Sequence, residues 1–222
     1  MENKEKAKVL KRFFKTDKGE YGEGDIFLGL TVPESRKIAK KYSSLSLEEV
    51  KSLLESKIHE ERLIALLILV NNYQKSNENI KKEIYNFYLK NTDKINNWDL
   101  VDLTADKIIG DYLLNNKKDI LYKLAKSDNL WERRVSIIST FQFIKNNEFK
   151  DVLNIAEILL RDKHDLIHKA VGWMLREIGK RNLEALESFL NKHYRSMPRT
   201  MLRYAIEKFQ EDKRQAYLKG EI

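Results

Sequence analysis

The sequence predicts an all-α protein, and three observations support this fold class. Apolar residues recur at three- and four-residue spacing along nearly the whole chain, which is the period of an amphipathic helix. Only two prolines occur, Pro33 and Pro198, and each opens a helix-like run where its missing N–H costs nothing. Helical segments also recur at intervals of roughly 35 residues, as in stacked helical hairpins.

Residues 1–45 are expected to form N-terminal helices around one irregular segment. Half of the eight glycines lie in "GEYGEGDIFLG", which marks this segment as a loop. The short apolar stretch "DIFLGLTV" is the one place where a strand-like piece could lie. Ser46, followed three residues later by Glu49, is a capping signal that opens the next helix.

Residues 46–215 are expected to form helical pairs. The second helix of each pair begins near "HEERLIALLILV", "INNWDLVDLTA", "LWERRVSIIST", "LIHKAVGWMLREIGK" or "RTMLRYAIEKF". Such pairs cannot bury their apolar faces alone, so stacking them would give a curved solenoid with a concave inner surface. An irregular helical bundle is the alternative, because the repeats share little identity. We expect residues 1–222 to form a single domain.

Charge and composition narrow the classes of partner and chemistry. The chain has 42 Lys and Arg against 34 Asp and Glu, a net charge of +8, which favours a polyanionic partner such as nucleic acid. Charge spread evenly for solubility would give the same sum. The absence of cysteine excludes disulfides, thiol nucleophiles and thiolate metal sites. No stretch is typical of a secretory signal or a membrane span, so we expect a soluble cytoplasmic protein.

The segment "NNWDLVD" places an indole beside two carboxylates. On a regular helix Asp102 would share a face with Trp98 and Asp106, with Asp99 at its edge. Carboxylates stacked in this way repel one another unless a cation faces them. Either a neighbouring helix or the substrate supplies that cation. A salt-bridged interface between repeats, with Trp98 as packing, is the alternative interpretation.

Arg134 and Trp173 break the patterns of their own helices. Arg134 lies in the middle of an apolar stripe, where an unpaired guanidinium costs several kcal/mol, so it must reach a carboxylate, a carbonyl or a phosphate. Arg133, off that stripe, is expected to be a solvated charge. Trp173 lies on a basic face with Lys169 and Arg176, which suits stacking or sugar contact in a nucleic-acid cleft. Packing against the next repeat would explain Trp173 as well.

No other segment predicts a catalytic or metal site. "HDLIH" spaces His164 and His168 like the ligands of a zinc protease, but its second residue is Asp rather than Glu and no third ligand is evident. We therefore expect surface histidines, no metal and no cofactor. Glycine-rich phosphate loops and the G-x-S-x-G motif are also absent from the sequence.

Taken together, "FLGLTVPESRKIAK", "NNWDLVD", "LWERRVSI" and "HKAVGWMLREIGK" resemble the AlkD-like bacterial DNA alkylation repair enzymes. The resemblance covers essentially the whole chain. It implies a right-handed superhelical solenoid of HEAT-like repeats with a concave basic cleft. It also implies a monomeric DNA glycosylase that excises positively charged N3- and N7-alkylated purines from duplex DNA and leaves an abasic site.

Residue by residue, the resemblance implies that Trp98, Asp102, Arg134 and Trp173 form the catalytic cleft. It further implies DNA contacts by Tyr21 and Arg36, and the basic face adds Lys169 and Arg176. Some members have a second aromatic residue where this chain has Asn97, and the family is understood to act without a lesion-specific pocket. Two alternatives remain open: a non-catalytic module that binds DNA structure or a protein, and an enzyme for branched or otherwise unusual DNA.

Overall fold

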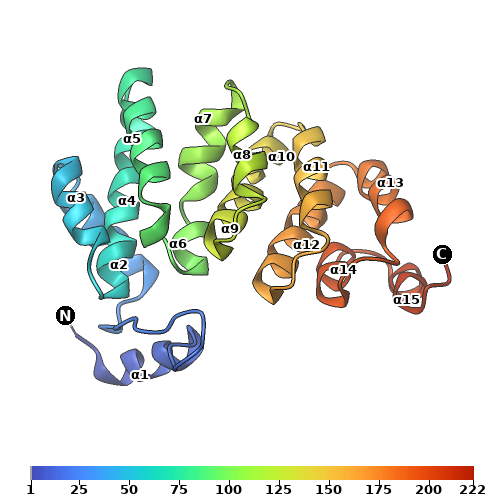
Figure 1. Cartoon of the computed structure of the whole chain (residues 1–222), viewed down its shortest axis with the longest axis horizontal. Coiled ribbons are helices and arrows are strands. Elements are labelled where there is room, and N and C mark those ends of the chain that lie inside the picture. Colours follow the sequence, from blue (N-terminus) through green and yellow to red (C-terminus); the bar gives the residue numbers. More distant parts are fainter. Residues whose placement is uncertain (1) are drawn as a thin grey trace. The chain divides into compact units, whose positions relative to one another are not determined.

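The computed structural model describes residues 2–222 and is helical throughout (Figure 1). Its internal contacts divide the chain into two compact units, Met1–Tyr112 and Leu113–Ile222. No β-strand is assigned in the described residues, so the all-α prediction is confirmed. The expectation of a single domain stays a prediction. No described helix is long and apolar enough to cross a membrane.

The first unit is built around the long central helix α4. Residues 63–70 of this helix are all apolar and all buried, so it is enclosed on every side. Helices α2, α3, α5 and α6 pack against it. The elements of this unit are α1 (Lys4–Phe13), α2 (Val32–Lys41), α3 (Leu47–Leu54), α4 (His59–Lys75), α5 (Glu78–Lys90), a 3-10 turn (Thr92–Lys94), α6 (Trp98–Asp102) and a π-helical turn (Asp106–Gly110), with α7 (Asp111–Leu114) at the division between the units.

The capping signals in the sequence form real caps. Ser46 and Glu49 make the predicted capping box at the start of α3, and Thr31 and Glu34 make another at the start of α2. Pro33 lies in the first turn of α2, and Pro198 is the residue just before α14. The prolines therefore fix where these helices begin.

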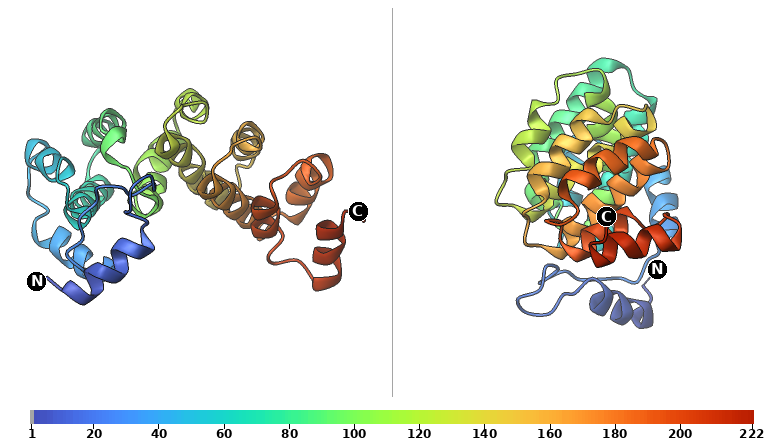
Figure 2. Two further views of the ribbon diagram at one scale, coloured as in Figure 1. Left: turned by 60° about the horizontal axis from the view of Figure 1, so that its bottom comes forward. Right: turned by 90° about the vertical axis from the view of Figure 1, so that its right-hand side faces the viewer.

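The glycine-rich segment crosses one end of the first unit together with α1, which is drawn in dark blue in Figure 2. Gly29 has φ near +87°, and a Cβ atom there would meet the Asn3 carbonyl oxygen at 2.2 Å, so only glycine fits. The strand-like piece expected nearby is reduced to an isolated bridge between Ile26 and Ile58. Its hydrogen bonds tie the segment to the residues that begin α4.

The second unit is centred on α12. Helices α9, α11, α13 and α14 pack against it, and α14 approaches so closely that a Cβ atom on Gly172 would meet the Met201 carbonyl oxygen at 2.5 Å. Its remaining elements are α8 (Asp119–Leu124), α9 (Leu130–Ser139), α10 (Phe141–Lys145), α11 (Lys150–Leu159), α12 (Asp165–Gly179), α13 (Leu183–His193), α14 (Arg199–Ala205) and α15 (Glu211–Lys219).

The predicted second helices correspond to α4, α6, α9, α12 and α14, each beginning within a few residues of the expected place. The largest departure is in α6. The sequence predicts a regular helix through residue 113, but α6 ends at Asp102 and the π-helical turn follows three residues later. The helical face expected to join Asp102 and Asp106 is therefore not continuous.

Candidate active site

Trp98 and Asp102 begin and end the short helix α6, and both line one cavity of the first unit. The buried side chain of Asn97 caps this helix by accepting a hydrogen bond from the Trp98 N–H at 2.8 Å. Trp98 and Asp102 are half-buried, whereas Asp99 and Asp106 are buried. The broken helix therefore presents the indole and the Asp102 carboxylate at the cavity and turns the other two carboxylates inward.

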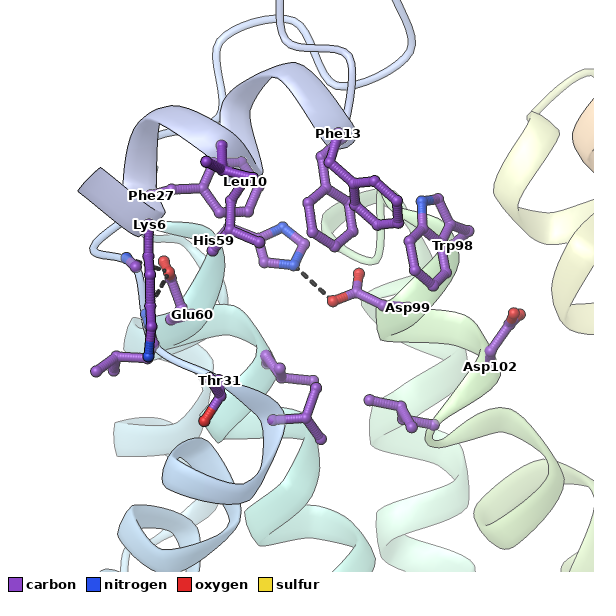
Figure 3. Close-up of a pocket in the computed structure, with 17 residues that line it drawn as sticks. Lys6, Leu10, Phe13, Phe27, Thr31, His59, Glu60, Trp98, Asp99 and Asp102 are labelled. Carbon is purple, nitrogen blue, oxygen red and sulfur yellow. Dashed lines mark hydrogen bonds and ion pairs between the residues drawn. The ribbon is translucent and has the colours of Figure 1, made fainter. Parts of the chain in front are cut away.

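The cavity lies beneath α1 and has a volume of about 430 Å³. Side chains from α1, the glycine-rich segment and helices α2, α4 and α6 line it, and most of its wall is apolar. Figure 3 shows Lys6 at one side of it and Trp98 and Asp102 at the other. Its opening is bordered by Val9 and Phe13, two apolar residues of α1 that are exposed.

Trp98 belongs to an aromatic cluster contributed mainly by the N-terminal residues. The Phe14 ring stacks on the indole with centroids 5.0 Å apart, and Phe13 meets the indole edge-on at 5.7 Å. Phe27 stacks in turn on Phe14 at 5.1 Å. Such ring pairs favour one mutual orientation, so the N-terminal helix sets the orientation of the indole at the cavity.

A buried charge network lies behind this cluster. The His59 side chain is 2% exposed, and its two ring nitrogens lie 3.2 Å from the Asp25 carboxylate and 2.8 Å from the Asp99 carboxylate. Arg62 also pairs with Asp25, at 2.8 Å. Burial by itself would lower the pKa of His59, but its hydrogen bonds to Asp25 and Asp99 raise that pKa to about 9. His59 is therefore a cation that links the glycine-rich segment to the start of α6.

Glu60 fixes the backbone on the other side of the cavity. Its buried carboxylate accepts hydrogen bonds from the backbone N–H groups of Leu28, Gly29 and Leu30, the shortest at 2.8 Å. A carboxylate held by several N–H groups in this way satisfies donors that would otherwise be buried without partners. Glu60 therefore holds the end of the glycine-rich segment against α4.

Arg134 lies in the second unit and is buried, as the apolar stripe around it predicts. One guanidinium nitrogen donates to the backbone carbonyl of Leu166 in α12 at 2.5 Å. The predicted need for a carboxylate, carbonyl or phosphate partner is thus met in part by a carbonyl. This contact fixes the direction of the side chain along the α9–α12 contact.

Trp173, also in the second unit, is half-buried on α12. Its indole N–H donates to Glu177 at 3.2 Å, and its ring centroid lies 5.9 Å from that of Phe141. The indole therefore packs partly against α10 and keeps part of its surface open. The residues expected on the opposite, core-facing side of the helix are all buried: Ile167, Val171, Leu175 and Ile178.

The four residues predicted to contact DNA lie on both units. Lys169 and Arg176 are half-buried on α12, where Lys169 pairs with Asp165 at 2.6 Å and Arg176 pairs with Glu207. In the first unit, Arg36 is exposed on α2, and Tyr21 is half-buried in the glycine-rich segment. Each cation therefore has at least part of its side chain open to solvent.

The sequence profile of the DNA alkylation repair enzymes matches residues 1–209 of the chain. The protein belongs to this family. No curated protein matches the chain significantly.

Solved structures of similar proteins have the same fold. A predicted DNA alkylation repair enzyme from Enterococcus faecalis superimposes with a TM-score of 0.72 at 17% identity, over 95% of this chain and 98% of the other. AlkD2 from Streptococcus mutans gives a TM-score of 0.57 at 20% identity, over 94% and 99% of the two chains. The protein smu.31 from Streptococcus mutans UA159 gives a TM-score of 0.56 at 20% identity over the same shares. The DNA alkylation repair enzyme described here therefore has the helical-repeat fold of these relatives, as its sequence predicts.

Two residues of this repair enzyme differ from the sequence-based expectation. Arg133 is not a solvated charge, because its Nε donates to Asp162 at 2.6 Å and its Nη1 donates to two backbone carbonyls. His164 caps α12 and His168 contacts the Asp162 carbonyl at 2.6 Å, so both are half-buried rather than fully on the surface. No group of three His, Asp or Glu residues within residues 2–222 could hold a metal ion.

The sequence analysis missed the residues that support Trp98 from behind, His59 and Phe14 above all. Their partners are distant along the chain, so helical spacing does not reveal them. One signal was present in "HEERLIALLILV", where three charged side chains open a helix that is otherwise apolar on every side. Buried charges at such a position must have partners, which predicts a charge network at the start of α4.

Proposed function

We propose that this protein is a monofunctional DNA glycosylase that excises cationic N3- and N7-alkylated purines from duplex DNA. The observation that carries the proposal is the half-buried Asp102 carboxylate beside Trp98, at a cavity whose walls are otherwise mostly apolar. Membership of the DNA alkylation repair enzymes gives this geometry its substrate class. A monomer acting on chromosomal DNA in the cytoplasm is part of the proposal.

The proposed reaction breaks the bond between C1′ and the purine nitrogen. The bonding electrons go to the cationic base, which leaves as a neutral molecule, and the deoxyribose becomes an oxocarbenium-like cation. A carboxylate about 4 Å from that charge is worth roughly 4 kcal/mol at an effective dielectric of 20, or on the order of a thousandfold in rate. Water then adds to C1′ and loses a proton, which leaves an abasic site without an amine nucleophile.

We assign the other predicted residues to binding roles. Trp98 and Trp173 hold deoxyribose against the faces of their indoles. Arg134, whose guanidinium is oriented by the Leu166 carbonyl, contacts a phosphate. Lys169, Arg176, Arg36 and Tyr21 contact the DNA backbone. These contacts position the lesion and carry no sequence readout.

The proposed site favours leaving groups that need no proton. His59 is the protonated acid nearest to Trp98 in the network, but both of its ring nitrogens face carboxylates, so its protons are directed away from the cavity. A neutral base would need protonation to leave at a comparable rate. Uracil, hypoxanthine and ethenoadenine should therefore be poor substrates.

Incubation with methylated duplex DNA tests the proposed function. We expect release of free N3-methyladenine and N7-methylguanine, measured by chromatography, with the DNA strand intact until alkali cleaves the abasic sites. Unmethylated duplex of the same sequence is the control and should release no base. Tight binding to DNA without release of either base would favour a non-catalytic module, and release only from branched DNA would favour an enzyme for unusual DNA structures.

A further inference from the structure

The cavity beneath α1 is large enough to hold a small molecule. Its volume of about 430 Å³ falls within the range of small-molecule sites in proteins, roughly 300–1,000 Å³. It begins at Trp98 and Asp102 and continues under α1 to Lys6 (Figure 3). A group that leaves a sugar held at Asp102 therefore has a space beside it.

The wall near Asp102 is suited to a planar ring. Phe13 is 60% exposed and Val9 is 67% exposed, although both belong to a helix that is otherwise rich in lysine and arginine. Phe13 presents its ring beside the indole of Trp98. Exposed aromatic surface of this kind stacks on planar ligands and attracts cations to the ring face.

The charges that line the cavity favour a cation. Three carboxylates, Glu60, Asp99 and Asp102, line it together with two cationic side chains, Lys6 and His59. The lining is thus acidic on balance in a chain whose net charge is +8. Asp102 is the carboxylate nearest the stacking surface of Trp98 and Phe13 in Figure 3.

The polar groups of the wall are engaged within the protein. Glu60 accepts from three backbone N–H groups, both nitrogens of His59 face carboxylates, and the Thr31 hydroxyl donates to Glu34 at 2.6 Å. These groups cannot read the hydrogen-bonding edge of a base without losing those partners. The cavity is therefore expected to select charge and planarity rather than the identity of the base.

We infer that this cavity binds the cationic alkylated base itself, stacked against Trp98 and Phe13 with its charge toward Asp102. The inference rests on the proposed function and adds a base-binding site to it. It differs from the expectation, drawn from the family resemblance, that no pocket receives the lesion. The occupant is a purine made cationic by alkylation, either as a free nucleoside or as a nucleotide of DNA turned out of the helix.

Nuclear magnetic resonance of the full-length, ¹⁵N-labelled protein tests binding without catalysis. The probe is N7-methylguanosine at mildly acidic pH, where its ring is cationic, with guanosine as the neutral comparison. We expect the Trp98 indole signal to shift on titration, and binding of the cationic nucleoside to be about tenfold tighter, as a cation–π contact would give. Val32→Phe, which fills the cavity from α2, should abolish the shift. Ile38→Phe, a half-buried position on the same helix that lines a different pocket, is the matched control.

The same two variants distinguish the nucleotide in DNA from the free nucleoside. In single-turnover release from methylated duplex, we expect Val32→Phe to be at least tenfold slower than Ile38→Phe. Loss of the indole shift with unchanged release would limit the site to free nucleosides and overturn a role in catalysis. Equal binding of both nucleosides, or no effect of Val32→Phe in either assay, would overturn the inference even if wild-type protein releases methylated bases. Absence of base release alone would instead count against the proposed function.

Discussion

Replacing Asp102 with asparagine should reduce base release by on the order of a thousandfold. The substitution keeps the shape of the side chain and removes its charge, so the roughly 4 kcal/mol of stabilisation that it gives the oxocarbenium-like sugar is lost. Binding to undamaged duplex should change little, because a carboxylate contributes nothing favourable to phosphate contacts. Single-turnover release of N7-methylguanine and a fluorescence-anisotropy titration with DNA measure the two effects separately.

Asp93→Asn is the matched control for this variant. Asp93 is exposed and pairs with Lys94 close to the start of α6, so its replacement removes the same charge without touching the cavity. It should release base at the wild-type rate. Arg134→Ala and Trp173→Ala should instead weaken both DNA binding and release. If Asp102→Asn works as fast as wild type, the carboxylate is structural and the interpretation as a repeat interface is correct.

Replacing His59 with glutamine should destabilise the first unit by about 3–5 kcal/mol, because it removes the cation that two buried carboxylates face. Asp25 would keep Arg62, but Asp99 would lose its imidazolium partner at the start of α6. Urea unfolding followed by circular dichroism gives the loss in free energy. His193→Gln, a partly exposed position in α13, is the control and should change stability little.

The stabilisation from His59 should also depend on pH in a defined direction. The pKa of His59 is about 9 in the folded chain against an ordinary value of 6.5, so folding favours the protonated form. The contribution, about 3 kcal/mol, is therefore complete below pH 6.5 and is lost as the pH rises through 9. Wild-type protein should lose stability across this window and His59→Gln should not. Parallel curves for the two proteins would show that His59 is neutral when buried.

The helical architecture could be predicted because local signals and packing agree. Capping boxes at Ser46 and Thr31 and the two prolines fix helix starts without reference to distant residues. The apolar run in α4 predicts a helix enclosed by others. The break after Asp102 could not be predicted, since apolar spacing continues across it and the π-helical turn depends on packing against α4 and α5.

The candidate site was predictable only where its residues contradict their local pattern. Asp102 and Trp98 stand out because a carboxylate and an indole recur on one short helix, and Arg134 stands out because it interrupts an apolar stripe. Phe13 and Phe14 give no such signal, since two phenylalanines on an amphipathic helix are typical of packing. Their role at the cavity follows from the tertiary contact of α1 with Trp98, which no spacing in the sequence encodes.

The central claim is that Asp102 assists the departure of a base that is already cationic. The most direct test is single-turnover release from two duplexes of identical sequence, one carrying N7-methylguanine and the other carrying hypoxanthine at the same position. We predict release of N7-methylguanine and no detectable release of hypoxanthine, because no acid is directed at the leaving group. Efficient excision of hypoxanthine, or failure to release N7-methylguanine from DNA that the protein binds, would contradict this account.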